Sequence, residues 1–138
     1  MNQYHYEDIA VSQKESFQVT ITEEMQMQFR QITGDENPLH KSDDFAKKRG
    51  YDRHVVFGMM TASFYSTLAG VYLPGEQSLI HSVETKFLKP VYVGDTLTIS
   101  GKVTEKNDTY RLIIIKAEIQ NQNGEKVSKA NMQIGLIE

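Results

Sequence analysis

Two side chains in one short stretch of this 138-residue chain have the chemistry of proton transfer. Asp35 and His40 stand five residues apart within Gly34–His40, a stretch that also contains Asn37 followed by proline. At pH 7 a carboxyl group is normally ionised and an imidazole is mostly neutral, so the two could hold one water molecule and move its protons. Asp, Asn and Pro are also typical turn residues. Acid–base catalysis and a purely structural turn are therefore both open for this stretch.

The amino-acid composition excludes several other kinds of site. The chain has no cysteine, which excludes disulfides, thiolate nucleophiles and cysteine-ligated metal centres. The other three histidines have no partner at metal-ligand spacing, so no metal site is predicted from His5, His54 and His81. With 15 basic and 18 acidic residues the formal net charge is −3, and no basic stretch could follow a phosphate backbone. We therefore expect no nucleic-acid partner.

The sequence has no segment typical of a membrane anchor or a secretory leader. The first residues, Met1–Asp8, have no basic start followed by an apolar run. No apolar segment reaches the ~18 residues that a membrane span requires. These features predict a cytoplasmic protein that does not contact a membrane.

The stretch with Asp35 and His40 lies between two expected helices. Residues 16–21 are β-rich and predict a first strand, after which Thr22 can cap a helix that ends at Gly34. A serine followed by two acidic residues begins a second, short helix over about 42–49. We expect the segment between the two helices to be an ordered loop.

The remainder of the chain predicts one central helix and a sheet. Residues 58–72 are apolar or small, with no charge, so we expect this helix to be buried on nearly every side. Four β-rich stretches with turn residues between them follow it, over about 79–89, 95–106, 110–121 and 126–137. The predicted class is α+β, with an antiparallel sheet wrapped around the central helix. Because the sequence has neither repeats nor linkers, we expect 1–138 to form one domain.

Four segments of the sequence resemble a single family. Phe29–His40 reads FRQITGDENPLH, which resembles the signature of the MaoC-like (R)-specific enoyl-CoA hydratases. Gly58–Ser63, Leu73–Gly75 and Phe87–Thr96 resemble that family's central helix start, the next loop and the strands after it, in the same order and at the same spacing. The resemblance covers about residues 20–105. It implies the hot dog fold, a sheet wrapped around a helix, which the residue patterns also predict.

The resemblance also implies an activity, the addition of water across the 2,3 double bond of a trans-2-enoyl thioester and its reverse, in fatty-acid or related acyl metabolism. This hydration needs a base for water, an acid for C2 and donors for the thioester oxyanion. Asp35 and His40 match the catalytic pair by position, with Asn37 in the turn between them. The backbone N–H of Gly58 matches the oxyanion donor, and Ser66 matches a serine that lines the pocket. Gly58 could instead be a plain helix start, and Ser66 could bond a carbonyl of its own helix.

One residue departs from the family pattern. Phe57 stands where the family commonly has a histidine before the glycine, which alters the local hydrogen bonding and the pocket mouth. The resemblance implies no cofactor beyond the CoA or the phosphopantetheine of an acyl carrier protein that the substrate carries. It also implies a homodimer or a dimer of dimers, since one such sheet exposes an edge. Basic residues near the loop either attract this anionic substrate or form a solvated face: Lys41, Lys47, Lys48, Arg49 and Arg53.

Two other functions are compatible with a hot dog domain. A hot dog acyl-thioester hydrolase would need a carboxylate aimed at the thioester carbon, and the pairing of Asp35 with His40 argues against it. A non-catalytic protein that binds acyl thioesters is the second, and Phe57 is the feature that supports it. The sequence therefore predicts a hydro-lyase, an enoyl-thioester hydratase or dehydratase.

Overall fold

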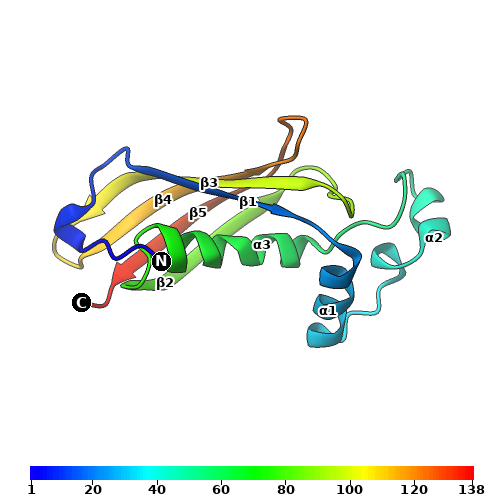
Figure 1. Cartoon of the computed structure of the whole chain (residues 1–138), viewed down its shortest axis with the longest axis horizontal. Coiled ribbons are helices and arrows are strands. Elements are labelled where there is room, and N and C mark those ends of the chain that lie inside the picture. The colour runs from blue at the N-terminus through cyan, green and yellow to red at the C-terminus, as the bar shows by residue number, and fades with distance from the viewer.

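One antiparallel sheet of five strands wraps along a helix in the computed structural model, which describes residues 1–138 (Figure 1). The helix is α3 (Gly58–Thr67). The strands are β1 (Lys14–Thr20), β2 (Ser78–Phe87), β3 (Thr96–Asn107), β4 (Leu112–Gln120) and β5 (Lys126–Leu136). Their order across the sheet is β1-β3-β4-β5-β2, so β1 and β2 are the two edge strands. The predicted α+β class and the sheet-wrapped helix are confirmed.

The sheet has one apolar face and one polar face because apolar side chains alternate along its strands. In β3, Leu97, Ile99 and Val103 are fully buried against the helix, whereas Lys102 is exposed on the opposite face. The same alternation continues along β4 and β5. The core therefore lies between the sheet and α3. Across this core, the hydroxyl of Tyr65 on α3 lies 2.6 Å from that of Ser128 on β5.

The central helix differs from the prediction in two respects. It is α-helical only to Thr67 and continues as a π-helical segment, η3 (Leu68–Tyr72), in which the Leu73 N–H donates to the Leu68 carbonyl at 2.8 Å. The expected burial on nearly every side is wrong for this chain. Met59 is 65% exposed and Ser66 is also exposed, because the sheet covers only one side of the helix.

The other two α-helices, α1 and α2, lie beyond one end of the sheet, away from both chain termini (Figure 1). Helix α1 (Glu23–Thr33) begins at Thr22, whose side chain accepts the Met25 N–H, and ends at Gly34 with φ +71°. Helix α2 (Asp43–Lys47) is shorter than the predicted 42–49. Two single 3₁₀ turns complete the helical elements, η1 (Tyr6–Asp8) and η2 (Pro38–His40). None of the helices has the length and apolar character needed to cross a membrane.

Candidate active site

The loop between α1 and α2 is shaped by its own side chains. Asp35 Oδ1 accepts the N–H of Asn37 at 3.0 Å, and Asn37 Oδ1 accepts the N–H of Leu39 at 3.0 Å. The second bond caps the 3₁₀ turn η2, which ends at His40, so the segment is more regular than the loop predicted from sequence. Asp35 itself is exposed, and its second carboxylate oxygen, Oδ2, has no hydrogen-bond partner in the chain. This oxygen remains available as a proton acceptor.

His40 is held by the loop that precedes α3. Its Nδ1 lies 2.8 Å from the carbonyl oxygen of Val55, and its ring stacks on Phe57 with a centroid distance of 4.2 Å and an interplanar angle of 29°. A carbonyl oxygen can only accept, so Nδ1 carries the hydrogen of this bond. In the neutral ring Nε2 therefore has a free lone pair. The structure presents His40 as a base with a fixed ring orientation.

A fully buried amide joins the two loops of the site, and the sequence patterns did not identify it. Gln26, on α1, donates through Nε2 to the carbonyl oxygens of His40 at 2.9 Å and Val55 at 3.1 Å. Its Oε1 accepts the N–H of Phe57 at 3.2 Å. A single side chain thus holds the backbone at His40 and at the residue immediately before α3. A glutamine within a helix usually lies on the surface, so only the structure reveals this role.

Gly58 supplies a free donor at the start of α3. As the first helical residue it has no acceptor for its N–H within the helix, and no other group of the chain accepts this hydrogen. A Cβ added at Gly58 would lie 3.0 Å from Cε1 of the Phe87 ring, so a larger residue would have to displace that ring. The free N–H and the helix dipole together favour a negatively charged oxygen beside Gly58.

His40 and Gly58 line the same pocket, which has a volume of about 290 Å³. Most of its wall is apolar and comes from the loops around η2 and α3 and from the end of β2. The other lining residues are Tyr51, Val55, Val56, Thr61, Phe87, Leu88, Lys89, Pro90, Val91 and Val127. A base and an anion-stabilising donor therefore converge on one mostly apolar cavity, which is the usual composition of a small-molecule site.

The other predicted site residues lie outside this pocket wall. Asp35 and Asn37 belong to the exposed loop beside it. Ser66 is exposed on the side of α3 that the sheet leaves uncovered, and its hydroxyl makes no hydrogen bond to the carbonyl of Ala62. The structure therefore brings two of the five predicted residues, His40 and Gly58, into one cavity.

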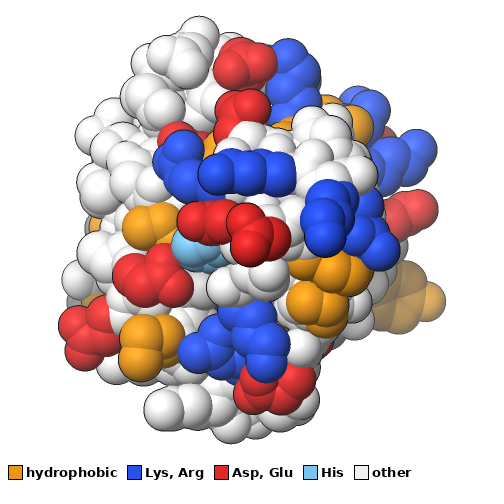
Figure 2. All heavy atoms as spheres, turned by 90° about the vertical axis from the view of Figure 1, so that its right-hand side faces the viewer, with side chains coloured by type: hydrophobic (Ala, Val, Ile, Leu, Met, Phe, Trp, Pro, Cys, Tyr) orange, Lys and Arg blue, Asp and Glu red, His pale blue; other side chains and the backbone are white.

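Charged groups of both signs surround the site end of the molecule, so it is not a uniformly basic surface (Figure 2). Lys41 pairs with Glu36 at 2.7 Å, and the Arg53 guanidinium donates to the Val93 carbonyl at 3.0 Å.

Among the described residues no group of three or more His, Asp or Glu side chains is arranged to hold a metal ion.

His54 ties α1 and α2 to the loop that carries Val55. Its ring nitrogens lie 2.6 Å from Asp43 Oδ1 and 3.0 Å from Glu23 Oε2. Desolvation lowers the pKa of His54, but the hydrogen bonds and charges of the two carboxylates outweigh it and the net pKa is raised. The backbone N–H and ring of His54 lower the pKa of Asp43 in turn. This cluster gives the loop before α3 a second anchor beside Gln26.

Comparison with known proteins agrees with the fold and identifies the family. The family model described as the MaoC like domain matches residues 7–126. The chain belongs to the MaoC-like domain family. An (R)-specific enoyl-CoA hydratase of Rhodospirillum rubrum is 34% identical over 107 residues, covering 75% of this chain and 74% of the relative. The (R)-specific enoyl-CoA hydratase of Aeromonas caviae is 34% identical over 96 residues, covering 70% of this chain and 72% of the relative.

Solved structures place this MaoC-like protein in the same fold. It superposes on the (R)-hydratase from A. caviae involved in PHA biosynthesis with a TM-score of 0.88 and 29% identity, covering 93% of this chain and 97% of that one. The match to the R-hydratase PhaJ1 from Pseudomonas aeruginosa has a TM-score of 0.89 and 26% identity, covering 96% and 85% of the two chains. The predicted family and hot dog fold are therefore confirmed.

The structure also explains how this MaoC-like chain accommodates Phe57. The phenyl ring makes no hydrogen bond and instead stacks on His40, while its backbone N–H is accepted by Gln26. The side chain is 2% exposed and packs in the core beside Phe29, with 5.1 Å between the ring centroids. Phe57 thus packs against one face of the His40 ring and leaves the Gly58 N–H free.

The buried amide of Gln26 generates a stability prediction. Gln26→Leu removes three hydrogen bonds and leaves the buried Phe57 N–H and the partly buried His40 carbonyl without a partner. We expect the free energy of unfolding to fall by about 2–4 kcal/mol. Gln28→Leu, an exposed position on the same helix, is the matched control and should change it by less than about 0.5 kcal/mol. Urea unfolding measures both, and equal losses in the two variants would contradict the role of Gln26.

Proposed function

We propose that this protein is an (R)-specific enoyl-thioester hydratase, which also works in reverse as a 3-hydroxyacyl-thioester dehydratase. The observation that carries the proposal is the pairing in one apolar pocket of an oriented imidazole, His40, with an unused backbone donor, Gly58. Relatives named as (R)-specific enoyl-CoA hydratases and as 3-hydroxybutyryl-CoA dehydratase support it. The activity is that of a hydro-lyase.

The proposed chemistry assigns one task to each group. With the thioester carbonyl at the Gly58 N–H, negative charge that develops on its oxygen is stabilised as water attacks C3. His40 Nε2 and the free Oδ2 of Asp35 take one proton from this water and deliver one to C2, so that O–H and C=C bonds break as C–O and C–H bonds form. Asn37 holds the turn between the two groups. Ser66 faces away from the pocket within one chain, and its predicted contact with substrate remains a prediction.

The substrate carries its own activating group, so the proposal requires no further cofactor. CoA and the phosphopantetheine of an acyl carrier protein both present a thioester, and a cytoplasmic location suits either carrier. A hydrolase would instead use the carboxylate against the thioester carbon, whereas Asp35 shares one short loop with the imidazole of His40. This pairing favours hydration over hydrolysis.

We also propose that the protein is a homodimer, formed through the exposed edge strand β2 and the uncovered side of α3. Met59, Val83 and Phe87 are apolar yet 65%, 39% and 51% exposed. Phe87 and Leu88, which line the pocket, remain half exposed at that edge. A second chain there would bury the apolar side chains and complete the pocket wall. A dimer of dimers is compatible with the same interface.

One assay tests the activity and separates the alternatives. With crotonyl-CoA as substrate, we expect the enoyl absorbance to fall while no free thiol appears, and chiral analysis to find the (3R)-3-hydroxybutyryl-CoA product. Appearance of free thiol would identify a hydrolase. A change in neither signal would identify a binding protein, and a mainly (3S) product would contradict the proposed (R) specificity.

The catalytic pair can be tested by a double-mutant cycle. If Asp35 and His40 act on the same water, Asp35→Asn and His40→Ala should each reduce kcat/KM by about 10²–10⁴-fold, with little further loss in the double variant. Independent roles would multiply to about 10⁴–10⁸-fold. His5→Ala, an exposed histidine of the N-terminal segment outside the pocket, is the control, and thermal melting verifies folding. Near-normal activity in both single variants would reject the proposed site and leave Asp35 as a turn residue.

The dimer can be tested by sedimentation. We expect a species of twice the 15.8 kDa chain mass at micromolar concentration. Val83→Glu should shift it toward the monomer, because the carboxylate would be buried at the paired edge. Tyr110→Glu, at a side chain that is 73% exposed in the turn between β3 and β4, should leave the dimer intact. A wild-type protein that sediments only as a 15.8 kDa species would refute the dimer.

A further inference from the structure

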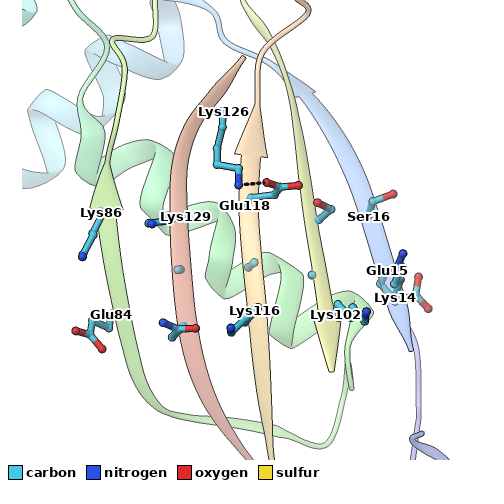
Figure 3. Close-up of a pocket in the computed structure, with 15 residues that line it drawn as sticks. Lys14, Glu15, Ser16, Glu84, Lys86, Lys102, Lys116, Glu118, Lys126 and Lys129 are labelled. Carbon is cyan, nitrogen blue, oxygen red and sulfur yellow. Dashed lines mark ion pairs between the residues drawn. The ribbon is translucent and has the colours of Figure 1, made fainter. Parts of the chain in front are cut away.

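A lysine-rich hollow lies on the outer face of the sheet, opposite α3 (Figure 3). It has a volume of about 800 Å³, and side chains from all five strands line it. Its six lysines are Lys14, Lys86, Lys102, Lys116, Lys126 and Lys129. Three glutamates also line it, so its local net charge is +3 on a chain whose formal net charge is −3. Positive charge is therefore concentrated on this face.

The lysines of this hollow are mostly without partners. Lys126 pairs with Glu118 at 3.0 Å, and no carboxylate lies within 4.0 Å of the ammonium group of the other five. Of the three glutamates, Glu15 already accepts hydrogen bonds from the hydroxyl of Tyr4 and the side-chain amide of Asn2. The exposed charges are consequently available to a binding partner.

The strand register places these like charges directly opposite one another. Lys102 on β3 pairs with Lys14 on β1 and with Lys116 on β4, so three lysines form a row across three strands. Lys86 and Lys129 are opposite each other on β2 and β5. Directly opposed like charges destabilise an antiparallel pair. A sheet selected only for stability would alternate the signs, as Glu118 and Lys129 do where β4 meets β5.

The lining composition indicates which anion fits. Only two of the fifteen lining residues are hydrophobic, Ala117 and Ala130, so the hollow does not suit an acyl chain. It has no arginine for bidentate phosphate binding and no aromatic side chain for stacking on bases. Its lysines are distributed over five strands, a span of about 19 Å, with hydroxyl and amide groups between them. We propose that this hollow is the docking surface for an acidic protein, bound through carboxylates spaced along its surface.

The binding test uses poly-L-glutamate as a carboxylate probe. We expect the wild type to bind it with an affinity that falls as salt is raised, and Lys102→Gln/Lys116→Gln to weaken this binding at low salt by about fivefold. Lys47→Gln/Lys48→Gln on the α2 end makes the same change in net charge outside the hollow and should stay within about twofold of the wild type. No binding by the wild type, or equal losses in the two variants, would overturn the proposal.

Two further measurements distinguish a docking surface from its competitors. Because Lys102→Gln/Lys116→Gln removes opposed like charges, its melting temperature should equal or exceed that of the wild type, so weaker binding cannot come from unfolding. Inorganic polyphosphate serves as the phosphate probe, and tighter binding of it than of poly-L-glutamate at equal charge concentration would show a phosphate site instead. Light scattering that shows self-association lost only in this variant would identify a second copy of the chain as the occupant. Either result would overturn the proposal.

Discussion

The side-chain amide of Gln26 is the contact on which the geometry of the site depends. It is completely buried, and all of its hydrogen bonds go to backbone groups of the two loops that form the pocket wall. The Phe57 N–H is buried, so removal of the amide would leave this donor without a hydrogen bond and the His40 carbonyl without its partner in the chain. The amide thus converts two irregular segments into one rigid unit. The orientation of the His40 ring and the position of the α3 start both follow from it.

The rest of the fold provides the platform for that unit. The sheet buries a continuous layer of aliphatic side chains against α3, and this layer fixes the axis of the helix whose first N–H faces the pocket. The cluster of His54 with two carboxylates fixes the same loop from its solvent side. The loop that carries Val55 is therefore held by a buried amide on one side and by a surface cluster on the other.

Local patterns in the sequence were sufficient for the framework. Strict alternation in β3, the cap at Thr22 and the glycine at 34 predicted their elements to within a few residues, because each depends on neighbouring residues only. The uncovered side of α3 could not be predicted, since Met59 is apolar and serine is compatible with a buried helix. Gln26 was missed for the opposite reason, because its type is common on surfaces. Long-range hydrogen bonds leave no periodic signal in a sequence.

The close approach of Gly58 to Phe87 limits how such a pocket can diversify. A side-chain carbon at position 58 would stand only 3.0 Å from the ring, so a larger residue there requires the half-exposed Phe87 ring to shift. The wall can vary more freely at side chains such as Tyr51 and Leu88, which lie at the solvent-exposed rim. The free N–H of Gly58 is thereby separated from the part of the wall that can vary. A lineage with this architecture can change the shape of the pocket without altering the start of the helix.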